Sequence, residues 1–357
     1  MKITEVETWR RSITLSQPYT IASRTIEAVR LVFVRLRADN GLQGLGSASP
    51  AREVTGESFE ACCEALEAGA LDWLHGSDAR QLNSLCRRLS TTMKETPAAR
   101  LAVETALHDL YCRHLGLSLV DYFGRCHESL PTSITIGIKP SIEEALEEAE
   151  GHVSAGFTCL KIKIGRNLEA DLELLTRLRR QHGPGIAIRV DANRGYSFEQ
   201  TATLWPTIER LGIELVEQPV RVQDFEQLTR LPEDQRRIIA ADESLIDDED
   251  ALALLRSPRP CGIFNIKLMK CGGLTTALSI ADLARLGEID LMWGCMDESA
   301  ISIAAAIHVA LACPRTRFLD LDGSFDLAGD PSTGGFRVAE GRLLLSEGVG
   351  LGVDLVD

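Results

Sequence analysis

The stretch TCLKIKIG, residues 158–165, carries two lysines, one residue apart, in an apolar run. Side chains two residues apart in a β-strand point to the same face. Lys161 and Lys163 therefore share one face of the predicted strand, and the apolar side chains between and around them share the other. Two like charges on the inner face of a buried strand need an explanation from the rest of the chain.

Short apolar runs of the same kind recur along the chain at an even step. After about residue 130, eight of them end at a polar residue or a cysteine. These ends are Thr135, Lys163, Asp191, Glu217, Asp242, Lys267, Cys295 and Asp320. Successive ends are 25 to 28 residues apart, and helical patterns lie between them. This alternation predicts an α/β fold of the (β/α)₈ type, a TIM barrel.

The two ends of the chain have a different pattern. VRLVFVRLRADNGLQGLGSA, residues 29–48, alternates, turns at Asn40-Gly41 and alternates again, which predicts a β-hairpin. PAARLAVETALHDLYCRHLG, residues 97–116, predicts a helix that stops at its final glycine. No clear helix follows the eighth strand, so the barrel is expected to be modified, (β/α)₇β. The glycine-rich stretch 334–354 reads as further strands.

These patterns divide the chain into three parts. We expect an N-terminal α+β domain over residues 1–125 and a (β/α)₇β barrel over residues 126–330. Residues 331–357 are expected to pack back on the N-terminal domain.

The composition excludes several classes of function. A formal charge of −14 over 357 residues, without a long basic run, argues against a nucleic-acid partner. Neither a signal peptide nor an apolar stretch of membrane-spanning length is evident, so we expect a cytoplasmic protein with no membrane partner. The ten scattered cysteines form no C-x-x-C pair and are expected to be free thiols. We also expect the chain to form a homo-oligomer.

Three acidic residues end consecutive predicted strands: Asp191, Glu217 and Asp242. In barrels of this type the carboxyl ends of the strands build the active site. Each acid alone reads equally as a cap or a surface charge. Together at one barrel mouth they would repel one another unless a cation lies between them. Oxygen ligands without histidine or cysteine favour Mg²⁺.

The lysines are expected on opposite sides of these acids. Lys163 belongs to the second strand and Lys267 to the sixth, and these strands are opposite in a closed eight-stranded barrel. Such a pair could take a proton from one face of a carbon atom and return it on the other. The competing interpretation is that the lysines only neutralise the acids.

Several motifs resemble the enolase superfamily, and its muconate-cycloisomerase-like subgroup in particular. They are KIKIG (161–165), RVDAN (189–193), VEQPV (216–220), AADES (240–244) and NIKLMKCGG (265–273). Residues 102–124 are similar to the helix of that superfamily's capping domain, which would make residues 1–125 a capping domain. DLDG (320–323) and GCMDES (294–299) resemble motifs of the dipeptide epimerases in the subgroup.

The resemblance implies roles for the residues at the strand ends. Asp191, Glu217 and Asp242 would bind Mg²⁺, and Lys163 and Lys267 would be the acid/base pair. Superfamily members of this kind use a lysine or histidine base, with Mg²⁺ stabilising an ene-diolate. The seventh strand carries no histidine, which argues against a member like mandelate racemase.

Lys161 is expected to assist Lys163. An ordinary lysine has a pKa near 10.4 and is a poor base at neutral pH. Two ammonium groups about 6.5 Å apart repel by roughly 2.5 kcal/mol at an effective dielectric constant near 20. That repulsion corresponds to nearly two pKa units. Lys161 would therefore lower the pKa of Lys163 and help to hold the substrate carboxylate.

The resemblance also implies how a dipeptide substrate is held. Asp320 and Asp322 would anchor its α-ammonium group, unless they only cap the following loop, and Thr135 would hydrogen-bond its backbone. Asp297 and Glu298 are then spare acids that could meet a basic side chain, whereas Arg24 could bind an acidic one. Asn193 and Glu243 are expected to support the metal ligands, and Lys270 is expected to be a surface charge.

The function predicted from these features is a Mg²⁺-dependent dipeptide epimerase, an isomerase that inverts an α-carbon and prefers cationic dipeptides. The alternatives are an L-Ala-D/L-Glu epimerase, a muconate-type cycloisomerase and an o-succinylbenzoate synthase. The last two have substrates without an ammonium group, so the Asp-x-Asp motif argues against them. A Schiff-base aldolase and a non-catalytic binding protein are alternatives from other classes.

Overall fold

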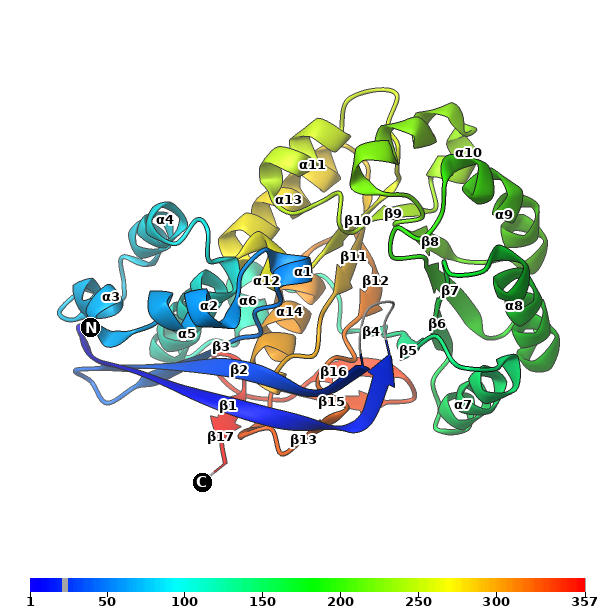
Figure 1. The fold of residues 1–357 in the computed structure, drawn as a ribbon. Coiled ribbons are helices and arrows are strands. Elements are labelled where there is room, and N and C mark those ends of the chain that lie inside the picture. Colours follow the sequence, from blue (N-terminus) through cyan, green and yellow to red (C-terminus); the bar gives the residue numbers. More distant parts are fainter. Residues whose placement is uncertain (21–24, 357) are drawn as a thin grey trace.

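The computed structural model describes residues 1–20 and 25–356. Figure 1 shows an antiparallel sheet with short helices beside an α/β barrel. The sheet has the strand order β13-β1-β2-β3. Its strands are β1 (Ile3–Thr20), β2 (Thr25–Ala38), β3 (Gln43–Ala48) and β13 (Leu327–Ala328). The predicted hairpin is confirmed, because β2 and β3 pair antiparallel around the Asn40-Gly41 turn.

Residues 1–125, which we call the N-terminal region, also contain the long helix α5 (Pro97–Leu115). It ends as predicted, with Gly116 in a left-handed conformation at φ 70°. α5 packs closely on β3, where a Cβ atom on Gly44 or Gly46 would collide with its backbone. The sequence GLQGLG therefore serves helix–sheet packing. The other helices of this region are α1 (Arg52–Thr55), α2 (Phe59–Ala65), α3 (Ala68–Leu71), η1 (Asp72–Leu74), α4 (Leu82–Thr92) and α6 (Leu119–Phe123).

The second body is an eight-stranded parallel sheet with the strands in chain order, β5 to β12. Its strands are β5 (Ile134–Ile136), β6 (Cys159–Lys163), β7 (Ala187–Asp191), β8 (Leu215–Glu217), β9 (Ile239–Ala241), β10 (Ile263–Ile266), β11 (Asp290–Gly294) and β12 (Thr316–Asp320). Each predicted strand end lies within one residue of the observed end. A bridge between Thr132 and Leu319 joins the first and last strands, which closes the barrel.

Helices surround the outside of the barrel, as Figure 1 shows. They are α7 (Ile142–Ser154), α8 (Leu168–His182), α9 (Phe198–Leu211), η2 (Val222–Arg230), α10 (Glu233–Arg236), α11 (Asp248–Leu254), α12 (Leu268–Cys271), α13 (Leu274–Leu286) and α14 (Ala300–Ala312). Helical segments follow each of the first seven strands, and β12 is followed by a turn and β13. The predicted (β/α)₇β architecture is therefore confirmed.

The C-terminal segment consists of short strands. They are β14 (Ser332–Gly334), β15 (Phe336–Ala339), β16 (Arg342–Leu345) and β17 (Val353–Leu355), and β16 also pairs with β4 (Ser129–Pro131). The segment contacts α5 through Asp109, which accepts a hydrogen bond from the backbone N–H of Leu351 at 2.8 Å. Arg113 donates to the carbonyl of Val353 at 2.7 Å. These contacts place the C-terminal segment against helix α5 of the N-terminal region.

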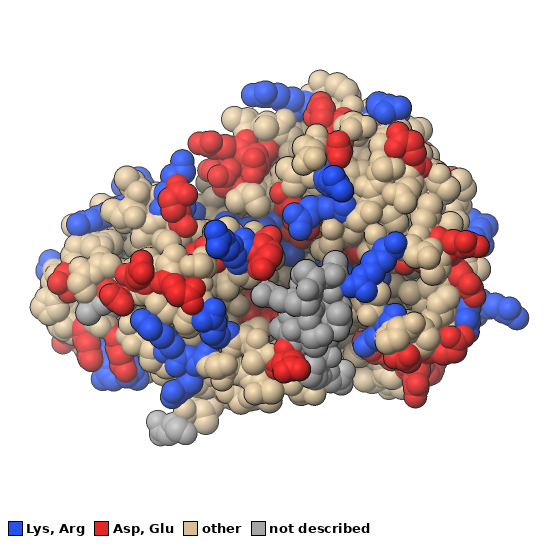
Figure 2. All heavy atoms as spheres, in the orientation of Figure 1, with Lys and Arg blue, Asp and Glu red and all other residues tan. Residues whose placement is uncertain are grey.

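Three further features of the structure are its surface charge, the length and polarity of its helices, and the state of its cysteines. Positive and negative side chains are interspersed on the face that Figure 2 shows. Among the described residues, no helix is both long and apolar enough to cross a membrane. All ten cysteines are free, as expected.

Candidate active site

The register of the parallel strands brings the predicted polar residues together at the carboxyl end of the barrel. Lys163 of β6 lies opposite Asp191 of β7, which in turn lies opposite Glu217 of β8. Asp242 directly follows β9, and Lys267 directly follows β10. In the strand order, β6 and β10 are four positions apart in a ring of eight, so Lys163 and Lys267 come from opposite sides of the barrel.

Lys161 lies among three carboxylates. Its Nζ atom is 2.6 Å from Asp320, 2.8 Å from Glu217 and 3.3 Å from Asp191. The side chain is only 2% exposed. Burial alone would lower the pKa of Lys161, but the three carboxylates outweigh it and raise the pKa well above its ordinary value. This ammonium group therefore supplies positive charge at the centre of the acids.

Lys163 stands closer to the solvent on the same face of β6. Its Nζ atom donates to Asp191 Oδ2 at 2.6 Å and to Asn193 Oδ1 at 3.1 Å. The side chain is 26% exposed. Burial acts to raise the pKa of Asp191, but Lys163 and Lys161 outweigh it and lower the pKa to about 2. Asp191 is therefore ionised at neutral pH.

Glu217 shows that the acids of this site lack enough positive partners. Its Oε1 atom accepts a hydrogen bond from Asn265 Nδ2 at 2.8 Å. Its Oε2 atom is buried and accepts none, although Lys161 Nζ lies nearby. Burial, followed by the charge of Asp191, raises the pKa of Glu217 to about 8. Several buried carboxylates share the single ammonium group of Lys161, and such an excess of negative charge fits a hard divalent cation.

The ligand atoms of Asp191, Glu217 and Asp242 do not all lie within 4.8 Å of one another. In the described part of the chain, one trio of His, Cys, Asp or Glu side chains has its ligand atoms all within 4.8 Å, and it lies elsewhere, at Cys86, Glu104 and His108. At the barrel mouth, lysine ammonium groups lie against the carboxylates instead.

Lys267 and Lys270 each bind a different carboxylate oxygen of Asp242. Lys267 Nζ donates to Oδ2 at 2.8 Å, and Lys270 Nζ contacts both Oδ1 and the main-chain oxygen. Burial acts to lower the pKa of Lys267, but Asp242 outweighs it and the net shift is upward. The expectation that Lys270 is a surface charge was wrong, because its side chain is 1% exposed. The four-residue helix α12 follows Lys267 and brings Lys270 Nζ to Asp242, directly after β9.

Asp320 of the Asp-x-Asp motif is buried and Asp322 is half-buried, and the two have different partners. Asp320 Oδ1 accepts from Ser133 at 2.6 Å, and Oδ2 is paired with Lys161. Asp322 Oδ2 accepts from the backbone N–H of Thr135 at 2.8 Å. Burial, then the charge of Asp320, raises the pKa of Asp322 to about 6. Thr135 thus holds Asp322 in place, which supports an anchoring role for that carboxylate.

The residues expected to bind a substrate side chain differ in their surroundings. Glu298 is buried, and its Oε1 atom accepts from the backbone N–H of Met296 at 3.0 Å. Glu298 therefore already has one protein partner, and its contact with a substrate side chain stays a prediction. Asp297 is half-buried, and its main-chain oxygen accepts from Ser49 of the N-terminal region at 2.7 Å. Arg24 lies outside the described residues.

Asn193 and Glu243 lie close in the chain to the metal-ligand candidates Asp191 and Asp242. The backbone N–H of Asn193 donates to Asp191 Oδ1 at 2.8 Å. Glu243 pairs with Arg194 at 3.1 Å, while its other oxygen is buried without a hydrogen bond. Asn193 and Arg194 have positive φ angles of 41° and 68°, which are strained for residues other than glycine. The loop after β7 thus stores strain at the barrel mouth.

Besides Lys270, sequence reasoning missed three supporting residues. They are Asn265, which bonds Glu217, Ser133, which bonds Asp320, and Gln218, whose side chain accepts from the backbone of Asp242 at 3.1 Å. The period of two could have identified the first two, because each lies two residues before a predicted strand-end residue. Gln218 follows a strand end and gave no such signal.

Comparison with known proteins gives the chain its family. Residues 3–124 match the family described as "Mandelate racemase / muconate lactonizing enzyme, N-terminal domain". Residues 144–357 match "Enolase C-terminal domain-like".

Two relatives align over nearly the whole chain. The chain is 52% identical over 353 residues to the L-Lys-D/L-Arg epimerase of Methylococcus capsulatus, covering 99% of both chains. It is 32% identical over 356 residues to the L-Ala-D/L-Glu epimerase of Clostridium acetobutylicum, again covering 99% of both.

A solved structure has the same fold throughout. It is the dipeptide epimerase of Methylococcus capsulatus in complex with Mg and the dipeptide L-Arg-D-Lys. The TM-score is 0.97 at 51% identity, and 99% of each chain is covered.

Proposed function

Because the chain belongs to the mandelate racemase/muconate lactonizing enzyme family of the enolase superfamily, we propose that it is a Mg²⁺-dependent dipeptide epimerase that prefers cationic dipeptides. The observation that carries this proposal is the placement of Lys163 and Lys267 on opposite sides of a barrel mouth that holds three carboxylates. A site for inverting a carbon centre needs a proton acceptor on one face and a donor on the other.

Lys163 and Lys267 are the proposed pair for proton transfer. The Nζ atom of one lysine, in its neutral form, takes the α-proton of the dipeptide's C-terminal residue. The Nζ atom of the other, in its ammonium form, gives a proton to the opposite face of the same carbon. The roles reverse with the direction of the reaction, so one site interconverts both epimers.

The acids at the mouth fit a resident Mg²⁺ ion. Asp191, Glu217 and Asp242 would hold it, as their all-oxygen donor set and their placement at the ends of three consecutive strands indicate. When bound, the ion would bind the substrate carboxylate and stabilise the negative charge of the ene-diolate. Lys161 would add positive charge beside the same carboxylate, because its Nζ atom lies between Asp191 and Glu217.

The Asp-x-Asp motif supports a substrate that carries an α-ammonium group. Asp322 is held by Thr135 but lacks a lysine partner of the kind that Asp320 has. A cation beside Asp322 would relieve the repulsion between the two carboxylates. Substrates of a cycloisomerase or an o-succinylbenzoate synthase have no such group, so this motif favours dipeptides.

The preference for cationic dipeptides rests on two observations. The relative with 52% identity is named an L-Lys-D/L-Arg epimerase. Asp297 also stands half-buried just past β11 and next to the N-terminal region. The alternative is an L-Ala-D/L-Glu epimerase, as one relative with 32% identity is named, and Arg24 would then bind the acidic side chain.

A panel of dipeptides assayed in deuterated water by mass spectrometry tests the proposal. We expect kcat/KM for L-Lys-L-Arg and similar dipeptides to exceed that for L-Ala-L-Glu by tenfold or more, about 1.4 kcal/mol of transition-state binding. A tenfold preference for L-Ala-L-Glu would instead make Arg24 the specificity residue. Activity should vanish with excess chelator and return with Mg²⁺. Borohydride trapping of a substrate adduct would support the aldolase alternative.

A further inference from the structure

Helix α5 of the N-terminal region forms hydrogen bonds with the loop that follows Lys267 and Lys270. The Arg100 side chain is buried and donates from Nε to the carbonyl of Gly272 at 2.6 Å and from Nη2 to the carbonyl of Cys271. These carbonyls end the short helix α12, which has no later turn to bond them. Arg100 therefore acts as a C-terminal cap supplied by a distant part of the chain.

Glu104, one turn further along α5, binds the start of the next helix. Its Oε1 atom accepts from the backbone N–H of Thr275 at 2.6 Å and from the Thr275 hydroxyl at 2.7 Å. Thr275 lies in the first turn of α13, where backbone N–H groups lack partners and an anion is favoured. We call the contacts of Arg100 and Glu104 with residues 271–275 the clasp.

Two glycines make the clasp possible. Gly272 and Gly273 have positive φ angles of 73° and 155°. A Cβ atom on Gly272 would collide with the guanidinium of Arg100, and one on Gly273 would collide with the carboxylate of Glu104. The Gly-Gly pair of NIKLMKCGG is therefore shaped for contact with α5.

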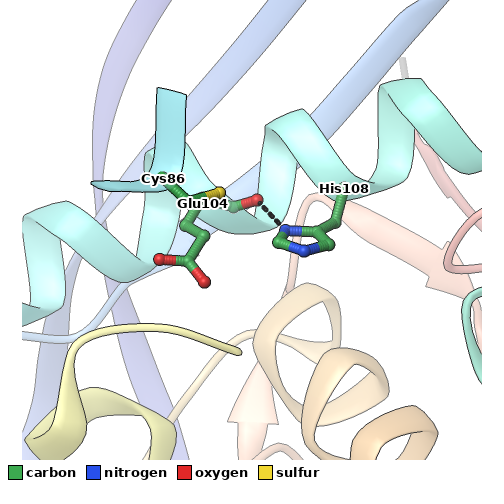
Figure 3. Close-up of side chains that lie close together, drawn as sticks. All are labelled: Cys86, Glu104 and His108. Atoms are coloured by element: carbon green, nitrogen blue, oxygen red, sulfur yellow. Dashed lines mark hydrogen bonds between the residues drawn. The ribbon is translucent and has the colours of Figure 1, made fainter. Parts of the chain in front are cut away.

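The groups around Glu104 fit a structural role better than a metal site. Figure 3 shows Cys86, Glu104 and His108 close together, with His108 Nδ1 hydrogen-bonded to the main-chain oxygen of Glu104 at 2.8 Å. Burial raises the pKa of the Cys86 thiol and lowers the pKa of His108, which keeps both neutral. The carboxylate of Glu104 already accepts hydrogen bonds from Thr275 in the first turn of α13.

The clasp is joined directly to the lysine side of the active site. Backbone N–H groups of Lys270 and Cys271 donate to the carbonyl of Lys267 at 3.0 and 3.1 Å. The turn from Lys267 to Cys271 is therefore one hydrogen-bonded unit. Two lysines of this unit, Lys267 and Lys270, contact Asp242, and Arg100 holds its last residue, Cys271.

We propose that Arg100 is a positioning residue for Lys267: by holding the Cys271–Gly272 carbonyls, it fixes the turn that aims the Lys267 ammonium group at the barrel mouth. The inference rests on the proposed function, in which Lys267 serves one face of the α-carbon. Lys163 needs no such support, because it is the last residue of β6, which pairs with β5 and β7, and Lys163 itself pairs with Asp191 of β7. Loss of the clasp should therefore slow proton transfer at one face of the α-carbon only.

Exchange of the α-proton with deuterated solvent, measured separately for each epimer, tests this proposal. The epimer that still exchanges in Lys163→Ala defines the Lys267 face. In Arg100→Met we expect exchange from that epimer to fall at least tenfold relative to the other epimer. Arg100→Lys keeps the charge and one donor, so a smaller bias in the same direction is expected.

Arg179→Met is the matched control. Arg179 also donates to backbone carbonyls, at Leu211, Gly183 and Ile186, but these loops lie at the opposite end of the barrel. Its loss should leave the ratio of the two exchange rates unchanged. Equal slowing of both epimers in the Arg100 variants, or no change, would overturn the proposal.

The outcomes also separate this inference from the proposed function. If the unaltered protein exchanges the α-proton of no dipeptide, the proposed function has failed. If it exchanges both epimers and the Arg100 variants show no bias, only the positioning role has failed. Should Arg100→Met not fold, as circular dichroism would reveal, an unbiased ratio in Arg100→Lys still overturns the proposal.

Discussion

The two lysine sides of the barrel mouth are built differently. On one side, Lys161 and Lys163 lie two residues apart in a strand, and neighbouring strands fix both. On the other, Lys267 and Lys270 lie three residues apart in a single helical turn, and both contact Asp242. A strand orients its side chains through its own pairing, whereas a short turn needs support from outside, which α5 provides here.

The difference also concerns solvent and charge. Lys163 is 26% exposed and can reach water if its acid is lost. Lys267 and Lys270 are 9% and 1% exposed, so both depend on Asp242 for a counter-charge. We call the side with Lys161 and Lys163 the strand side and the side with Lys267 and Lys270 the turn side. The strand side should therefore tolerate the loss of an acid better than the turn side.

The largest expected effect is the loss of turnover in Asp242→Asn. The substitution removes a proposed metal ligand and the shared partner of two lysines. We expect kcat to fall by roughly 10³-fold or more. Isothermal titration with Mg²⁺, alongside the turnover assay, would show whether metal binding is lost as well. Full activity in this variant would rule out the metal-ligand assignment.

The stability of the same variant sharpens the contrast between the sides. Asp242→Asn leaves two buried ammonium groups without a charged partner, and breaking a buried pair costs about 3–5 kcal/mol. Asp191→Asn leaves Lys163 near water and Lys161 with two other acids. We expect urea unfolding with chelator present to show a difference of about 2 kcal/mol between the variants. Equal losses of stability would contradict the contrast.

Asp322→Asn tests the proposed binding of the substrate's α-ammonium group by Asp322, which lies on neither lysine side. Asparagine keeps the acceptor for the Thr135 N–H but removes the charge. A hydrogen bond to a charged group contributes about 1.5–3 kcal/mol, so we expect KM to rise roughly 10- to 100-fold, with a smaller change in kcat. An N-acetylated dipeptide is the control, because it should lose affinity for the original protein and not for the variant.

The last prediction concerns acid stability away from both sides, where the effect per pH unit is small. His308 of α14 is buried, accepts from the backbone N–H of Val120 at 3.0 Å, and has its pKa lowered by burial to about 4. Between pH 6.5 and 4 the unfolded chain binds a proton here that the folded chain does not. The free energy of unfolding should therefore fall with decreasing pH, by up to about 1.4 kcal/mol per unit. In His308→Asn this part of the pH dependence should disappear; an unchanged slope would contradict the assignment.

The sequence predicted the strand side well because its signal is local. The even spacing of strand ends located all eight strands, and the period of two placed Lys161 and Lys163 on one inner face. The three acids followed from the same spacing. Their register, with Lys163 opposite Asp191 and Asp191 opposite Glu217, matches that expectation.

The turn side could not be predicted in the same way. Lys270 follows the strand by four residues, and only the helical turn of α12 brings it back under Asp242. The clasp joins residues 171 and 172 positions apart in the chain, so no local pattern indicates it.

The central claim is that two opposed lysines each serve one face of the α-carbon. Its most direct test is solvent deuterium exchange from purified L,L- and L,D-dipeptides in Lys163→Ala and Lys267→Ala. Neither variant should epimerise, and each should still exchange the α-proton of one epimer, with the two variants retaining opposite epimers. Exchange of both epimers to the same extent in either variant would contradict the account.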